Sequence, residues 1–221
     1  MTQPIPPTPS GLLIIDKPLG LTSMDVCRRV RRRLVAAGAP KRVKVGHAGT
    51  LDPLATGLLV ILVGKCTRLC DQIMLGEKSY LARVDLSAFS TTDDAEGERT
   101  QVPVPVPPTL QQLRHACDSF TGTIMQAPPS FSAMKIDGQR AYKLARKGNL
   151  VSIPPRPVSI HSIAITAYAW PFADLAIDCG KGTYIRSLAR DLGRALSTGG
   201  TLASLRRTRV APFTIDQARP L

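Results

Sequence analysis

The distribution of apolar and polar positions predicts a chain that mixes helices with strands. Residues 58–63 form an unbroken apolar run after a glycine-rich segment, which is typical of a buried strand. Further strands are predicted at residues 12–15, 79–86, 158–169 and 175–179. Helices and strands alternate irregularly, and several strands are consecutive after Pro157. This order favours the α+β class, with a mixed, largely antiparallel sheet, over a doubly wound parallel sheet.

Helix starts are marked by two capping boxes. Thr22 and Asp25 precede a segment whose apolar residues recur every four positions, and Thr109 and Gln112 precede a second helix that ends before Gly122. A short helix is predicted at residues 67–75, and a longer one follows Gly182. Residues 1–10 carry four prolines and no periodicity, so we expect a disordered lead-in. The stretch 123–149 reads as an inserted binding loop.

The chain is strongly basic, because it has 29 lysines and arginines but only 16 acids, which gives a formal charge of +13. Nucleic acid is the expected partner of so basic a chain. An anionic membrane surface is the rival, but no apolar run approaches the roughly 18 residues that a span needs, and no signal sequence is present. Five cysteines without a C-x-x-C pair predict reduced thiols and a cytoplasmic location.

Basic residues gather in several places. The polar face of the first helix carries arginines at 28, 29, 31, 32 and 33, which fit either a solvated surface or phosphate contacts. Lys41, Arg42 and Lys44 stand just before the glycine-rich segment, and Arg186, Arg190 and Arg194 lie four apart on the last helix. The acidic stretch 91–98 does not have the spacing of an EF-hand and is predicted to be a solvated loop.

The glycine-rich segment 46–57 contains three glycines, one proline and a single acid, Asp52. Pro53 disfavours the α conformation at Asp52, so one carboxylate is presented in an extended loop next to a buried strand. A metal site would need further ligands, yet His47, His115 and His161 are far apart in the sequence. A glycosidase would need a second acid, and a phosphate cradle would need a lysine. The remaining readings are a lone nucleophile or base, and an aspartate that caps a turn.

Residues 46–59 resemble the catalytic motif of the TruB-type tRNA pseudouridine synthases. Segments 13–23, 78–80 and 182–188 match the same family in the same order, and the resemblance extends from about Gly11 to Phe213. It implies one catalytic domain over residues 11–221, built on a curved sheet flanked by helices, with an active cleft across the sheet. It also implies that residues 123–149 form a thumb over the RNA. Because the chain stops at Leu221, the small C-terminal RNA-binding domain usual in bacterial members is expected to be absent.

The resemblance implies roles for individual residues. Asp52 is the essential catalytic residue, Arg186 pairs with it, and Tyr184 lies against the base near C5 as a candidate general base. His47, Tyr80, Leu205 and Lys17 are expected to contact the flipped nucleotide; without the family, a lone histidine or core tyrosine is the ordinary reading. The expected RNA-binding residues are Arg28, Arg29, Arg32, Lys41, Arg42, Lys44, Arg140 and Arg190.

Arg186 also stands in the first turn of a helix, where the macrodipole disfavours a cation, so an anion is expected beside it.

The expected reaction needs no cofactor and no metal. By resemblance, the protein is a monomeric isomerase that converts uridine to pseudouridine in the T-arm loop of tRNA, at position 55. Attack of Asp52 at C1′ and proton abstraction at C2′ both remain open. The alternative is a basic RNA-binding or RNA-folding module in which catalysis is secondary or lost.

Overall fold

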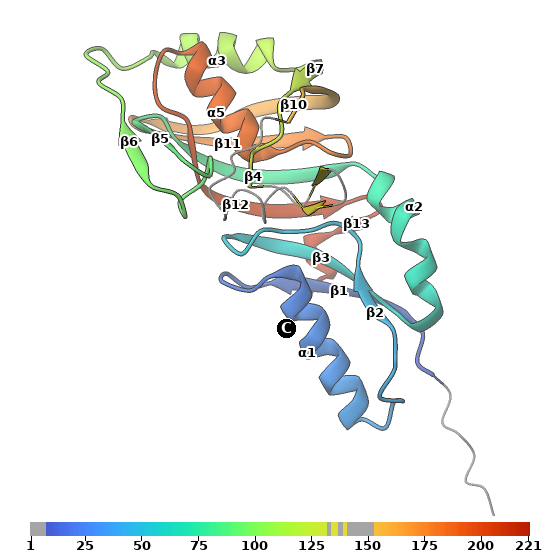
Figure 1. Ribbon diagram of the computed structural model, residues 1–221. Helices are drawn as coiled ribbons and strands as arrows, with labels where there is room; N and C mark the ends of the chain where they lie inside the picture. Colours follow the sequence, from blue (N-terminus) through green and yellow to red (C-terminus); the bar gives the residue numbers. More distant parts are fainter. Residues whose placement is uncertain (1–7, 132–133, 137–138, 141–152) are drawn as a thin grey trace, which may run out of the picture. The chain divides into compact units, whose positions relative to one another are not determined.

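The computed structural model describes residues 8–131, 134–136, 139–140 and 153–221 (Figure 1). The chain divides into two compact units, the first made of residues 1–79 and 206–221 and the second of residues 80–205. Among the helices of the described ranges, none has the length and apolar character needed to cross a membrane.

The first unit is built around a long apolar strand. Its elements are β1 (Gly11–Lys17), α1 (Ser23–Ala36), β2 (Val45–His47), β3 (Ala55–Val63), η1 (Gly64–Leu69), α2 (Cys70–Leu75), β13 (Phe213–Thr214), η2 (Ile215–Gln217) and β14 (Arg219–Pro220). β3 pairs antiparallel with β1 and with β2, and β14 runs parallel to β1. Leu58, Val60 and Leu62 of β3 join Ile73 and Val210 in the core.

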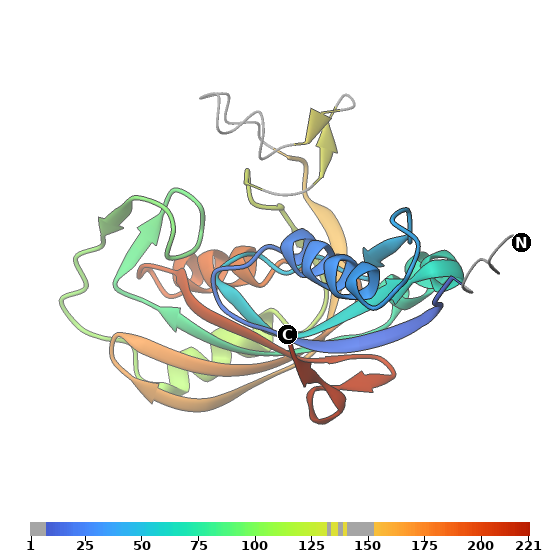
Figure 2. The same ribbon diagram turned by 90° about the horizontal axis from the view of Figure 1, so that it is seen from below.

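The second unit has the sheet order β4-β11-β10-β7. Its elements are β4 (Lys78–Asp85), β5 (Ala88–Ser90), β6 (Arg99–Gln101), α3 (Leu110–Ser119), β7 (Gly122–Gln126), β8 (Lys135–Ile136), β9 (Gln139–Arg140), β10 (Arg156–Ala169), β11 (Phe172–Cys179) and α5 (Ile185–Ala195). β12 (Thr201–Val210) carries the chain from this unit back into the first. Helix α3 contacts both α5 and β10 (Figures 1 and 2). Leu86, Leu113, Ile160, Leu175 and Leu188 are among the buried residues of its core.

The α+β class and the largely antiparallel pairing are confirmed. Both capping boxes form as predicted, with the Thr22 hydroxyl accepting from Asp25 N and the Thr109 hydroxyl accepting from Gln112 N. β12 was not predicted, because its arginines and threonines lack an apolar alternation. Ser10 falls in the expected lead-in, yet its hydroxyl accepts a hydrogen bond from Lys65 N at 2.9 Å. The ordered chain therefore includes Ser10.

Candidate active site

The loop that carries Asp52 is shorter than the sequence indicated, because both of its ends belong to strands. β2 pairs with β3 so that His47 faces Ile61, and β3 begins at Ala55 rather than at the predicted Leu58. Ala48 N also donates to Val60 O at 2.9 Å. The loop is therefore limited to residues 48–54, and a single buried strand anchors both of its ends.

Every backbone carbonyl from Gly49 to Pro53 accepts a hydrogen bond. The donors are Arg207 Nη2 to Gly49 O (3.1 Å), Arg207 Nη1 to Thr50 O (3.5 Å), Ser23 Oγ to Leu51 O (3.1 Å), Ala55 N to Asp52 O (3.0 Å) and Gly20 N to Pro53 O (2.9 Å). The Ser23 hydroxyl also accepts from Leu51 N at 2.8 Å. A loop held at each carbonyl keeps its one carboxylate in a fixed position, which is what a catalytic group requires.

Lys17 is bonded to the end of this loop. Its side chain is fully buried, and Nζ donates to Leu21 O (2.7 Å), Pro18 O (3.0 Å) and Pro53 O (3.4 Å). Burial lowers the pKa of Lys17 to about 8; the Asp52 carboxylate opposes this shift, and the Arg207 guanidinium adds to it. The ammonium group of Lys17 thus bonds to backbone carbonyls that include one of the Asp52 loop, and the substrate contact expected for Lys17 stays a prediction.

Arg207 also holds this loop, and the sequence analysis did not single it out. It is among the largest fully buried side chains, and its Nε donates to Leu58 O at 2.8 Å in addition to its two bonds to the loop. Gly57 has φ +97°, and a Cβ there would lie 2.2 Å from Arg207 O. Gly57 could have indicated this contact from the sequence, since a glycine inside an apolar strand often marks a close approach of another backbone.

Replacing Arg207 by methionine should lower the free energy of unfolding by about 3 kcal/mol, because three carbonyls lose a charged donor in a buried environment. Arg209 on the same strand is the matched control: its side chain is 38% exposed and bonded to Glu77, so Arg209→Met should cost about 1 kcal/mol or less. Urea denaturation of both variants measures the difference. If both variants lost the same free energy of unfolding, the role of Arg207 in holding the loop would be contradicted.

In the second unit, Arg186 projects from the first turn of α5 and is buried. Its Nη1 lies 3.3 Å from Asp94 Oδ2 and donates to Thr92 O at 3.2 Å, while Nη2 donates to Phe131 O at 3.0 Å. The anion expected beside this arginine is therefore present within the unit, and it is Asp94. Asp52 belongs to the first unit, so its pairing with Arg186 stays a prediction.

The expectation of a solvated acidic loop is confirmed for Glu96 and Glu98, which are exposed, but not for Asp94. Asp94 is buried, and its Oδ1 accepts hydrogen bonds from the Thr92 hydroxyl (2.5 Å) and Glu96 N (3.0 Å). Burial raises the pKa of Asp93 even though Arg190 lies beside it and favours its charged form. The sequence showed a run of polar residues but could not show that arginines of α5 reach this loop.

Arg190 is mostly buried and bonded within the protein, and its expected contact with RNA stays a prediction. Its side chain is 12% exposed, and it donates to Asp93 Oδ2 (2.8 Å), Asp191 Oδ1 (2.9 Å) and Ala127 O (3.0 Å). Arg194, by contrast, has a side chain that is 66% exposed. Arg190, which belongs to α5, therefore links the acidic loop to this helix through its bond to Asp93. Its charge is compensated inside the protein by Asp93 and Asp191.

The remaining expected contacts are divided between the units. Tyr80 and Leu205 are partly buried against the apolar core of the second unit, where Tyr184 stands as the residue preceding α5. His47 is half-buried on β2 of the first unit, and its carbonyl accepts from Cys70 Sγ at 3.4 Å. The structure thus places Asp52, Lys17 and His47 in the first unit, and Tyr80, Tyr184, Arg186 and Leu205 in the second.

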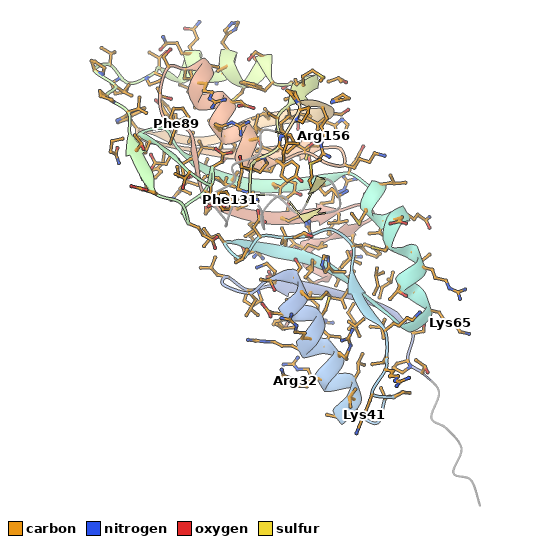
Figure 3. The ribbon with its side chains drawn as sticks, viewed as in Figure 1. Arg32, Lys41, Lys65, Phe89, Phe131 and Arg156 are labelled. Carbon is orange, nitrogen blue, oxygen red and sulfur yellow. The ribbon has the colours of Figure 1, made fainter. Side chains whose placement is uncertain are left out.

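The basic residues expected to bind RNA in the first unit are exposed. They are Arg28, Arg29, Arg32, Lys41, Arg42 and Lys44. Arg28 Nη1 forms a surface ion pair with Asp25 at 2.7 Å. Arg32 projects from α1 away from the strands, and Lys41 lies near the end of the same helix (Figure 3). The side chain of Arg140 and the basic run at 141–147 lie outside the described residues.

Comparison with known proteins places the chain in a family. The model of the TruB family pseudouridylate synthase N-terminal domain matches residues 32–185, which is more than half of the chain. The model of the tRNA pseudouridylate synthase B C-terminal domain matches residues 186–220. A tRNA pseudouridine synthase B of Arthrobacter sp. (strain FB24) is 48% identical over 218 residues, covering 96% of this chain and 69% of the relative. That of Thermobifida fusca (strain YX) is 48% identical over 220 residues, covering 96% and 73%.

Solved structures agree with this assignment. A Cbf5-Nop10-Gar1 complex contains a similar chain, with a TM-score of 0.72 and 28% identity, covering 96% of this chain and 52% of that chain. An H/ACA RNP bound to a substrate RNA containing 2′-deoxyuridine gives a TM-score of 0.68 and 25% identity, covering 95% and 50%. This chain therefore spans about half the length of those solved chains. The chain shares its fold and its sequence with these proteins, and it has an extended loop that holds one aspartate. It therefore belongs to the TruB family of tRNA pseudouridine synthases, isomerases that convert uridine to pseudouridine.

Proposed function

We propose that this protein forms pseudouridine at the T-arm loop of tRNA, at position 55, with Asp52 as the catalytic carboxylate. The observation that carries the proposal is the loop 48–54, in which the backbone carbonyl of Asp52 and those on either side of it are held by hydrogen bonds. Preorganisation of this kind serves a side chain that must meet its target atom within a fraction of an ångström.

The chemistry is an internal transfer. The N1–C1′ bond of the target uridine breaks, the uracil turns, C5 joins C1′, and the C5 proton is lost while N1 gains one. Asp52 attacks C1′ or removes a proton from C2′, and both routes require its ionised form. Arg186 keeps it ionised if the two side chains approach within about 4–6 Å in the RNA complex, since a cation at that range lowers a carboxylate pKa.

The target base must leave the RNA stack before any of its atoms can be reached. We assign stacking on the flipped uracil to Tyr80, contact near C5 to Tyr184, an apolar wall to Leu205 and support of the vacated space to His47. Aromatic side chains commonly bind unstacked bases in this way.

Phosphate contacts are assigned to the exposed basic residues of the first unit. The net charge of +13 and the exposure of Arg28, Arg29 and Arg32 on one helix support this assignment. Each phosphate neutralised contributes about −0.7 to −0.9 to the slope of log K against log salt. We further propose that the protein acts as a monomer in the cytoplasm, where its free cysteines would stay reduced.

Release of tritium from C5-labelled uridine tests the proposal. An isolated T-arm hairpin and whole tRNA should be modified with similar efficiency, and affinity for both should fall steeply with salt. If whole tRNA were preferred by more than about tenfold, about 1.4 kcal/mol of contact outside the T-arm would be required, and the proposed account of the basic surface would be wrong. RNA binding and folding without tritium release would favour an RNA-folding module instead.

A further inference from the structure

Two residues that face each other on neighbouring strands both contact Tyr184. Gln126 ends β7 and Arg156 begins β10, and the antiparallel register pairs them directly. In Figure 3, Arg156 stands in the second unit beside the segment that enters α5. One cross-strand pair of the sheet therefore places two polar side chains against Tyr184, the residue that precedes α5.

Gln126 holds the backbone of Tyr184. Its Oε1 accepts from Tyr184 N at 2.8 Å, and its Nε2 donates to Tyr184 O at 3.1 Å. Gln126 is buried, so these bonds are shielded from water. The Tyr184 backbone is extended, with φ −103° and ψ 112°, and the two bonds fix it at the point where the chain turns into the helix.

Arg156 holds the ring of Tyr184. Its Cζ lies 5.4 Å from the ring centroid, and its Nη2 donates to Gly182 O at 2.9 Å. Gly182 has φ +80°, and a Cβ there would lie 3.3 Å from that same nitrogen. A side chain at position 182 would therefore crowd the guanidinium, and the glycine leaves it room over the ring.

We propose that Arg156 is a positioning residue for Tyr184: its guanidinium covers one face of the ring and leaves the opposite face for the uracil of the substrate. This inference rests on the proposed function, in which Tyr184 contacts the flipped base. An aromatic ring has two faces, and a cation on one of them fixes the ring plane while remaining compatible with stacking on the other.

Arg83 provides a structural contrast within the same unit. Its guanidinium lies over the ring of Phe172 at 5.8 Å, but its Nε and Nη2 each donate to the Asp174 carboxylate at 2.7 Å. Its charge is therefore matched by an acid at an exposed site. Arg156 instead combines a ring contact with a bond to the turn that carries Tyr184, so both of these contacts act on one short segment.

The test compares Arg156→Met and Arg156→Lys with Arg83→Met as the matched control, using a T-arm hairpin as RNA. Arg156→Met should lower the single-turnover rate at saturating RNA by about tenfold, the upper range for a cation–π contact. The dissociation constant of the RNA should stay within about twofold of wild type. Arg156→Lys should recover most of the rate, because an ammonium also binds a ring face. Arg83→Met should leave both quantities unchanged.

The same Arg156 substitution in a Tyr184→Leu protein distinguishes a wrong role for Tyr184 from a wrong role for Arg156. With no ring to position, Arg156→Met should cause no further loss of rate there. An additive loss in that background, or a loss of RNA affinity with an unchanged saturating rate, would overturn the inference. If Tyr184→Leu alone kept the wild-type rate, the proposed role of Tyr184 would fail. If Tyr184→Leu were slow while Arg156→Met was not, the positioning inference alone would fail. Equal melting temperatures of the variants exclude unfolding as the cause.

Discussion

Asp52→Asn should abolish pseudouridine formation while leaving the fold and RNA binding intact. The amide is nearly isosteric with the carboxylate, but it acts neither as a nucleophile nor as a base. Because the loop 48–54 is held through its backbone carbonyls, the substitution leaves those hydrogen bonds in place. We expect the single-turnover rate to fall by more than about 10⁴-fold, a barrier increase of more than about 5 kcal/mol.

A matched control for this variant is Asp71→Asn, which changes an exposed acid on α2 of the same unit. It should retain the wild-type rate. Asp93, which the sequence pattern offers as a solvated control, is unsuitable because it is bonded to Arg190. Measurable turnover by pure Asp52→Asn would refute the assignment of Asp52.

The second large effect is expected at Arg186. Arg186→Lys keeps the charge but loses the planar group that contacts Asp94, Thr92 O and Phe131 O at once. We expect the single-turnover rate to fall by about 100-fold, which corresponds to about 2.7 kcal/mol, with RNA affinity within about threefold of wild type. Titration of labelled RNA and single-turnover kinetics measure the two quantities separately.

Asp94→Asn should lower the rate by a similar factor, because it removes the carboxylate that orients the arginine. In the double variant the two losses should be far from additive, since residues in contact share one interaction. Glu96→Gln is the control, as this exposed residue of the same loop bonds Asp94 through its backbone nitrogen. Additive losses would show that Asp94 and Arg186 act independently.

The features that could be predicted from the sequence are those whose interacting residues lie close together in the chain. The capping boxes at Thr22 and Thr109 were predictable because all partners lie within four residues of each other. The Asp52 loop was recognisable because glycine, proline and a buried strand stand next to one another. The resemblance then identified the family, which the comparisons confirm.

What the sequence could not reveal were contacts made by side chains distant in the chain. Arg207 was not singled out in the sequence, and only the folded structure shows its bonds to Gly49, Thr50 and Leu58. Asp93 and Asp94 looked solvated for the same reason. A charged residue is ordinarily exposed, so a buried one is identified by its partners rather than by its neighbours in sequence.

The residues that hold the Asp52 loop lie far apart in the chain, so they are added at different times during protein synthesis. Lys17 and Ser23 are made before the loop, but Arg207 is made only after all 126 residues from 80 to 205 of the second unit. A nascent chain can thus complete the second unit while the loop still lacks two of its carbonyl partners. The loop that carries Asp52 therefore gains its last two carbonyl hydrogen bonds only after the whole second unit has been made.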